Sequence, residues 1–100
     1  MKIVNCVRYV EDLAKVAVLR PAHRSFMSEL LRQNKLVAGG PFGDGSGAIF
    51  VYEVRDLEEA ERLVAEDPYM AGGAIFGYEL RQWIVVSANT SLIEPSLDAH

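Results

Sequence analysis

Apolar and polar positions alternate over residues 2–10, and many of the apolar side chains there are β-branched or aromatic. Such side chains suit the half-buried surface of a sheet, so this segment is predicted to form a strand. Similar patterns predict a short strand over residues 36–42, a stronger one over 48–54 and a last one over 74–86. Residues 43–47, Gly-Asp-Gly-Ser-Gly, have the composition of a hairpin connection.

A helical period occurs in two segments. From Pro21 to Asn34, apolar residues recur at spacings of three and four, and proline suits the first turn of a helix because it lacks an amide hydrogen. We therefore expect the main helix over this segment. A second helix is expected to begin after Asp56, which can cap it. It should stop at or near Asp67, because Pro68 disfavours the helical conformation for the residue before it.

The predicted order, β-α-β-β-α-β, is that of a ferredoxin-like α+β fold, in which both helices lie on one face of an antiparallel sheet. The third and fourth strands carry large apolar side chains on both faces, and two helices can cover only one of them. A second subunit's sheet is the simplest cover, which predicts a homodimer in the form of a dimeric α+β barrel. We expect one domain over residues 1–86 and a C-terminal tail over 87–100, either flexible or packed on the partner subunit.

Composition narrows the class of function. The 100 residues, half of them hydrophobic, suffice for one globular domain. The formal net charge is -4 and the ten Lys and Arg residues are scattered, which argues against a nucleic-acid partner but not against a small anionic ligand. No segment approaches the roughly 20 apolar residues of a membrane-spanning helix. The N-terminal residues lack the pattern of a signal peptide, so a cytoplasmic protein is expected.

Metal and cofactor chemistry find little support. Cys6 is the single cysteine and lies in an apolar stretch, so we expect a buried structural thiol. His100 is terminal and no histidine pair has ligand spacing, so we predict neither a metal nor a cofactor. The string Gly43-x-Gly45-x-x-Ala48 is like a dinucleotide fingerprint, but that fingerprint needs a following helix, and a strand is predicted here.

Two polar residues fall on helix faces that should be apolar. His23 faces inward near the start of the main helix. Asp67 continues the apolar stripe of the second helix at its C-terminal end, where the helix dipole disfavours a carboxylate. A lone inward histidine is more often a satisfied core residue, but a buried carboxylate is costly unless paired. If the two side chains meet, the carboxylate would fix the imidazole tautomer and make His23 a competent general base.

Other residues could complete a binding site. Arg20, one turn before the histidine, could hold a carboxylate or phenolate by paired hydrogen bonds, or be a solvated charge. Tyr69, Phe42 and Trp83 could wall an apolar pocket, although aromatic residues at such positions are more often core. Ser46 in the hairpin could act as a nucleophile with a His-Asp pair, yet nothing resembles a nucleophile elbow.

Three short motifs occur together: Arg20-x-x-His23 opening a helix, Gly39-Gly40-Pro41 before a Gly/Asp hairpin, and Glu59-Ala60 leading to Asp67-Pro68-Tyr69. Their order and spacing resemble the YCII-related (YciI-like) family over roughly residues 1–83, with the tail unmatched. The resemblance implies a dimeric α+β barrel and a His-Asp pair, here His23 and Asp67, as active site. It also implies that Arg20 and the Gly40-Pro41 turn line the same pocket, and we add Ser46 and Tyr69 as candidate substrate-binding residues.

In the wider barrel superfamily, this resemblance points to lactone isomerases, dehydrochlorinases of hydroxylated aromatics and cofactor-free monooxygenases. Our leading hypothesis is therefore a small-molecule enzyme of aromatic compound catabolism. His23 would move a proton during isomerisation or elimination, and Arg20 would stabilise the developing oxyanion. Two alternatives stay open: a non-catalytic ligand-binding or assembly domain in which the pair only fixes the fold, and a cofactor-free monooxygenase acting on a quinol-like compound.

Overall fold

The computed structural model describes residues 1–95. One sheet contains four strands: β1 (Lys2–Tyr9), β2 (Leu36–Pro41), β3 (Gly47–Glu53) and β4 (Ile75–Trp83). The helices are α1 (Leu13–Arg32), α2 (Leu57–Glu66), α3 (Pro68–Ala71) and the short 3-10 helix η1 (Thr90–Leu92). The strand order is β2-β3-β1-β4 and every neighbouring pair is antiparallel. The predicted ferredoxin-like α+β fold is confirmed.

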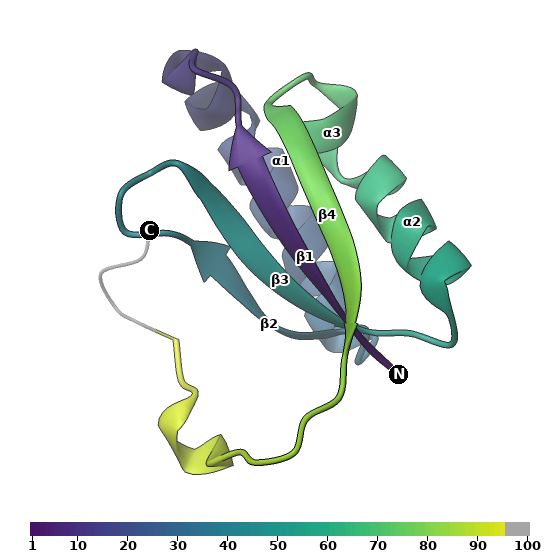
Figure 1. Ribbon diagram of the computed structural model, residues 1–100. Helices are drawn as coiled ribbons and strands as arrows, with labels where there is room; N and C mark the ends of the chain where they lie inside the picture. Colours follow the sequence, from purple (N-terminus) through teal and green to yellow (C-terminus); the bar gives the residue numbers. More distant parts are fainter. Residues whose placement is uncertain (96–100) are drawn as a thin grey trace.

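The core lies between the sheet and the helices, with α1 crossing behind the sheet in the view of Figure 1. Its main cluster joins side chains from β1, β2, β3, α1, α2 and the residue after β3: Ile3, Val7, Met27, Leu30, Leu36, Ala48, Phe50, Tyr52, Val54, Ala60, Leu63 and Val64. Asn5 is a polar exception on the inner face of β1 and is only 2% exposed. Side chains on alternate positions of a strand point to opposite faces, so this inner face is fixed by the period of two.

The helix α1 begins well before the start that the sequence pattern indicated. It starts at Leu13, where the Asp12 side chain accepts a hydrogen bond from the amide of Lys15 at 3.4 Å, and Pro21 lies inside it. Val16 is buried in a second core cluster with Tyr69 and Ala74. This packing offsets the backbone hydrogen bond that an interior proline cannot make. The expected start at Pro21 is therefore wrong, and the free amide groups of the helix start lie far along the helix from Arg20 and His23.

The outer face of the sheet is not covered by any helix among residues 1–95 (Figure 1). Cys6 is exposed on this face, so the expectation of a buried thiol is wrong. Its neighbours in β1 take the inner positions, and the period of two then turns Cys6 outward. Val4, Ile49, Val51 and Trp83, with Arg81 and Gln82, line a shallow hollow of about 470 Å³.

The last strand ends at Trp83, three residues before the predicted end. The following residues run away from the sheet as exposed chain, with Val86 90% exposed, and carry the helix η1. The predicted tail over 87–100 lies partly outside the described residues. None of the described helices is both long enough and apolar enough to span a membrane.

Candidate active site

The helix α1 and the junction between α2 and α3 bring His23 and Asp67 into contact. The imidazole Nδ1 lies 2.8 Å from Asp67 Oδ1 and 3.1 Å from Oδ2. The two residues are 7% and 6% exposed. Because an ionised carboxylate can only accept, Nδ1 of the neutral ring carries the hydrogen and Nε2 keeps its lone pair. The contact therefore selects the imidazole tautomer that can take up a proton at Nε2.

The position of Asp67 follows from its local sequence. Its backbone is extended, α2 ends at the preceding Glu66, and Pro68 begins α3, in line with the helix stop expected from Pro68. The side chain of Asp67 also accepts a hydrogen bond from the amide of Tyr69 at 2.9 Å, which caps α3. One buried carboxylate thus holds two buried donors, and these two bonds fix its orientation toward the imidazole.

Aromatic rings enclose the imidazole. Tyr69 stacks on it with ring centroids 3.9 Å apart and planes inclined by 13°. Phe50 of β3 approaches it with a centroid separation of 5.3 Å. Tyr9 in turn contacts Tyr69 edge-on at 5.6 Å. The stacked tyrosine and the carboxylate together restrain the rotation of the imidazole, so Nε2 has a defined direction.

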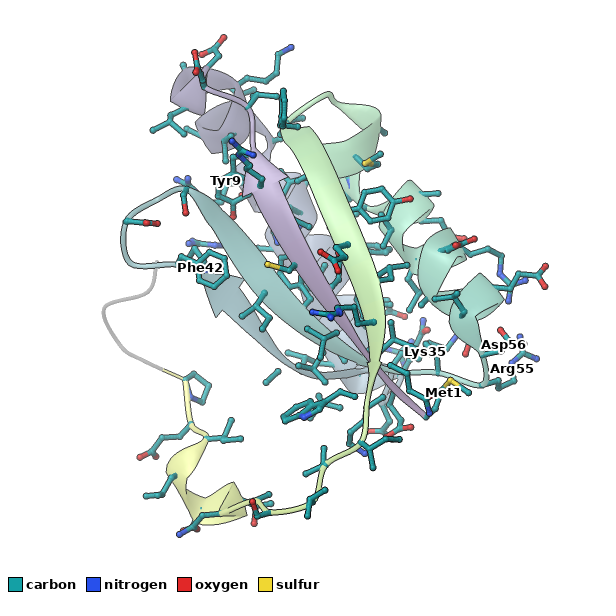
Figure 2. All side chains as sticks on the ribbon, in the orientation of Figure 1. Met1, Tyr9, Lys35, Phe42, Arg55 and Asp56 are labelled. Atoms are coloured by element: carbon teal, nitrogen blue, oxygen red, sulfur yellow. The ribbon has the colours of Figure 1, made fainter. Side chains whose placement is uncertain are left out.

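Tyr9 marks the end of the sheet at which this site lies. Figure 2 shows it at the opposite end from Met1, Lys35 and Arg55. Burial, together with the neighbouring Tyr69, raises the pKa of Tyr9 to about 12, and the positive charge of Arg20 opposes the shift. The Tyr9 hydroxyl is therefore protonated near neutral pH and can donate a hydrogen bond, and Arg20 lies within electrostatic range of it.

The remaining predicted binding residues are not all near the dyad. Tyr69 stacks on the imidazole, whereas Arg20 is placed only within electrostatic range of Tyr9. Pro41 pairs with Ala48 and shares the helix-facing side of the sheet, whereas Gly40 pairs with Ile49, which is 40% exposed on the outer face. Successive residues of a strand face opposite sides of the sheet, so Gly40 and Pro41 lie on opposite faces. Phe42 and Trp83, considered as pocket walls, are 38% and 46% exposed.

Ser46 is held within the β2–β3 hairpin. Its hydroxyl and its amide donate to Asp44 Oδ1 at 2.6 Å and 2.9 Å, and its carbonyl accepts from the amide of Tyr9 at 3.0 Å. The hydroxyl is thus bonded to Asp44, and the structure does not join it to His23. A hollow of about 320 Å³ beside Ser46 is lined by residues 8–11, Leu13, and residues 44–46.

The sequence did not point to Asn5, Phe50 or Tyr52, and Gly39 was noted only as part of the Gly39-Gly40-Pro41 motif. A Cβ atom on Gly39 would lie 2.6 Å from Phe50 Cδ1, so glycine allows β2 to lie against the ring that contacts the imidazole. Asn5 was detectable as a polar residue at an inward position of an apolar strand. Phe50 and Tyr52 look like ordinary sheet residues until the strands are paired. No cluster of three or more metal-ligating side chains occurs within the described chain.

The fold and the site define an α+β protein with a buried His-Asp pair between helices and sheet. The family model of the YCII-related domain matches residues 1–84. The chain belongs to the YCII-related family, as its motifs indicated.

Two known proteins are similar to this chain. The uncharacterized protein YjpA of Bacillus subtilis (strain 168) is 36% identical over 52 residues, which cover 52% of this chain and 61% of that protein. The match thus spans less than two thirds of that relative's length. The solved structure of 5-chloro-2-hydroxyhydroquinone dehydrochlorinase (TftG) from Burkholderia phenoliruptrix AC1100, in complex with 2,5-dihydroxybenzoquinone, matches with a TM-score of 0.74 at 19% identity. The match covers 84% of this chain and 94% of TftG, and it shows a common fold.

Proposed function

We propose that this chain is an enzyme that moves a proton on a small hydroxylated aromatic or lactone-like substrate. His23 Nε2 is the base, and Asp67 holds the imidazole and stabilises the imidazolium that forms. The observation that carries this proposal is the buried contact of Nδ1 with the carboxylate. Among residues 1–95, Nδ1 is the ring nitrogen of His23 that has a hydrogen-bond partner, which leaves Nε2 for a substrate.

The chemistry requires only a proton and an electron pair to move. Nε2 removes a proton from a ring hydroxyl, or from a carbon next to a carbonyl, and the electron pair shifts into the ring. In an isomerisation the imidazolium returns the proton to another carbon. In an elimination a leaving group such as chloride departs with its bonding pair. The Tyr9 hydroxyl and the Arg20 guanidinium, at the same end of the site, are the donors that can stabilise the oxyanion.

The similarity to TftG supports the substrate class. That protein is named as a dehydrochlorinase of a chlorinated, hydroxylated ring and was solved with a dihydroxylated quinone. The aromatic side chains of Tyr69 and Phe50 beside the imidazole suit a planar ring of that kind.

A second candidate is a non-catalytic domain in which the same pair only ties α1 to the junction of α2 and α3. It is favoured by the low exposure of both side chains, 7% and 6%, and by their packing between aromatic rings. The two candidates differ in what the imidazole contributes. For a structural pair the hydrogen bond to Asp67 is sufficient, whereas for a base the second ring nitrogen is required.

The variant His23→Asn separates the candidates, because its side-chain NH₂ takes the place of Nδ1 and can still donate to Asp67 but has no basic nitrogen. Chloride release and ultraviolet absorbance would be followed with chlorinated hydroquinones and unsaturated lactones, with and without oxygen. On the enzymatic proposal the variant folds normally and turnover falls at least about 100-fold. The exposed Arg24→Gln on the same helix is the matched control and should keep both properties. Absence of turnover by the native chain on the whole panel, together with a lower melting temperature of His23→Asn, would overturn the proposal.

We also propose that the outer face of the sheet binds a second copy of this chain. The proposal is supported by the apolar side chains of Val4, Ile49, Val51 and Trp83 there, and by the lack of a helix over them among residues 1–95. A sheet packed face to face on another sheet would remove the exposed Ile49 and Trp83 and the half-buried Val4 from water.

A further inference from the structure

Within residues 1–95 the buried apolar side chains form two separate clusters, and the imidazole of His23 lies between them. The main cluster includes Phe50, whose ring is 5.3 Å from the imidazole. The ring of Tyr69 belongs to the smaller cluster and stacks on the imidazole at 3.9 Å. The smaller cluster consists of Val16, Tyr69 and Ala74.

Two segments of the chain, residues 10–20 and 68–74, surround the smaller cluster, and we call them the cap. The amide of Val10 in one segment donates to the carbonyl of Ala74 in the other at 2.9 Å. The helix α3 packs on α1, and Figure 1 shows α3 and the start of α1 at the same end of the sheet. The two segments are therefore tied to each other and can move as one unit.

Each connection between the cap and the rest of the chain lies at an interruption of regular backbone structure. In α1 the boundary falls at Pro21, which has no amide hydrogen to bond to the carbonyl four residues earlier. Between α2 and α3 the backbone is extended at Asp67. In the pairing of β1 with β4, the register shifts between Arg8 and Tyr9. Kinks and hinges in proteins occur at positions of this kind.

The His23–Asp67 pair is covered while the cap is in place. Its members are 7% and 6% exposed, and neither of the two hollows described above is lined by them. A base must come within about 2.6–3.2 Å of the proton that it removes, so a substrate needs room beside the imidazole. Tyr69 holds the cap closed, by its ring stack and by its amide bond to Asp67 Oδ1 at 2.9 Å.

We propose that the cap opens at these hinges, lifts Tyr69 off the imidazole and so admits the substrate to His23. His23 follows Pro21 and Asp67 precedes the second cap segment, so the hydrogen bond between them is kept in the open form. Arg20 moves with the cap, and closure therefore brings the proposed oxyanion donor back over the bound ring and excludes water.

Opening exposes the three buried side chains of the smaller cluster and leaves the main cluster intact. It therefore requires less free energy than global unfolding. The inference rests on the proposed function for the reason to open, whereas the opening itself is measured on the chain without a substrate.

Access to the imidazole can be measured with diethyl pyrocarbonate, a reagent that acylates an unprotonated imidazole nitrogen. Mass spectrometry would follow the reaction at His23, and free N-acetylhistidine would give the rate for an uncovered ring. In the native chain His23 should react at least about tenfold more slowly than the free compound, because the closed form predominates. The reaction should still go to completion, because the cap opens.

Two matched variants distinguish opening of the cap from global unfolding. Val16→Ala removes packing from the smaller cluster, so the rate at His23 should rise at least about fivefold. Val54→Ala makes the same change in the main cluster, next to Met1 at the opposite end of the sheet from Tyr9 (Figure 2). It should leave the rate within about twofold of the native value.

A second pair of variants tests the hinge in α1. Pro21 is exposed, so Pro21→Ala supplies the missing amide hydrogen without disturbing the core. The added hydrogen bond stiffens the helix and should lower the rate at His23 at least about threefold. The control Ser28→Ala, at an exposed position beyond the hinge in the same helix, should leave the rate unchanged.

Any of four results would overturn the inference. His23 of the native chain could react as fast as N-acetylhistidine, or fail to react at all. Val16→Ala and Val54→Ala could change the rate equally, which would mean that only global unfolding uncovers the ring. Pro21→Ala could react at the native rate, which would remove the hinge. Full turnover by His23→Asn would overturn the proposed function but leave this inference standing, because acylation reports access alone.

Discussion

Replacing Asp67 with asparagine should change the tautomer of His23 without a large change of shape. In the native chain Oδ1 accepts from both His23 Nδ1 and the Tyr69 amide, and Oδ2 lies 3.1 Å from Nδ1. If the asparagine oxygen keeps the Tyr69 amide, its NH₂ group replaces Oδ2 and points its hydrogens at Nδ1. That arrangement favours an Nδ1 that accepts, so the hydrogen moves to Nε2 and the base is lost.

The size of the effect follows from the hydrogen bonds that change. A bond to a charged acceptor is worth about 1.5–3 kcal/mol and a neutral one about 0.5–1.5 kcal/mol, so Asp67→Asn removes about 1–2 kcal/mol from the Nδ1–H tautomer. At about 1.4 kcal/mol per tenfold change, the tautomer ratio should shift about 5- to 30-fold toward Nε2–H. The same loss should lower the melting temperature by about 4–15 °C in a domain of this size.

Nitrogen chemical shifts of the two ring nitrogens report the tautomer directly and need no substrate. The chain has two histidines, His23 and His100, so a His100→Gln variant assigns the signals. The matched control is Glu66→Gln, which removes the same charge from the preceding exposed residue and should leave the His23 shifts unchanged. A native His23 with its hydrogen on Nε2, or an Asp67→Asn variant with the native tautomer, would refute the reasoning.

Three further predictions concern packing, pH and assembly. Gly39→Ala should lower the free energy of unfolding by about 1–3 kcal/mol in urea denaturation, since its Cβ meets Phe50, whereas Gly40→Ala, with nothing within 4 Å, should have little effect; equal losses would contradict this. Folding raises the pKa of Tyr52 from 10.0 to about 12. The free energy of unfolding should therefore be steady below about pH 10 and decrease between about pH 10 and about pH 12. Tyr52→Phe should reduce this decrease by up to about 3 kcal/mol. Ile49→Glu should convert a dimer into monomers in analytical ultracentrifugation, and a native monomer would remove the basis for the proposed dimer.

The order of strands and helices could be predicted because periods of two and of 3.6 residues are local properties of the chain. The inward direction of His23 and the helix stop at Asp67 also follow from local spacing and from Pro68. The start of α1 could not be predicted in this way. Pro21 disfavours the interior of a helix locally, and only the burial of Val16 against Tyr69 and Ala74 outweighs that preference.

The sequence by itself therefore determined the order of the elements, the family, and the unusual inward placement of two polar residues, His23 and Asp67. Only the tertiary structure decided which strand face receives the helices, because a period of two is the same for both faces, and this choice left Cys6 outside and Asn5 inside. The tertiary structure also decided which distant residues contact each other. The 2.8 Å contact between His23 and Asp67 joins residues 44 positions apart. The 3.2 Å hydrogen bond from Asn5 to Tyr52 joins residues 47 positions apart. Contacts of that range depend on strand register and helix packing, which no local pattern encodes.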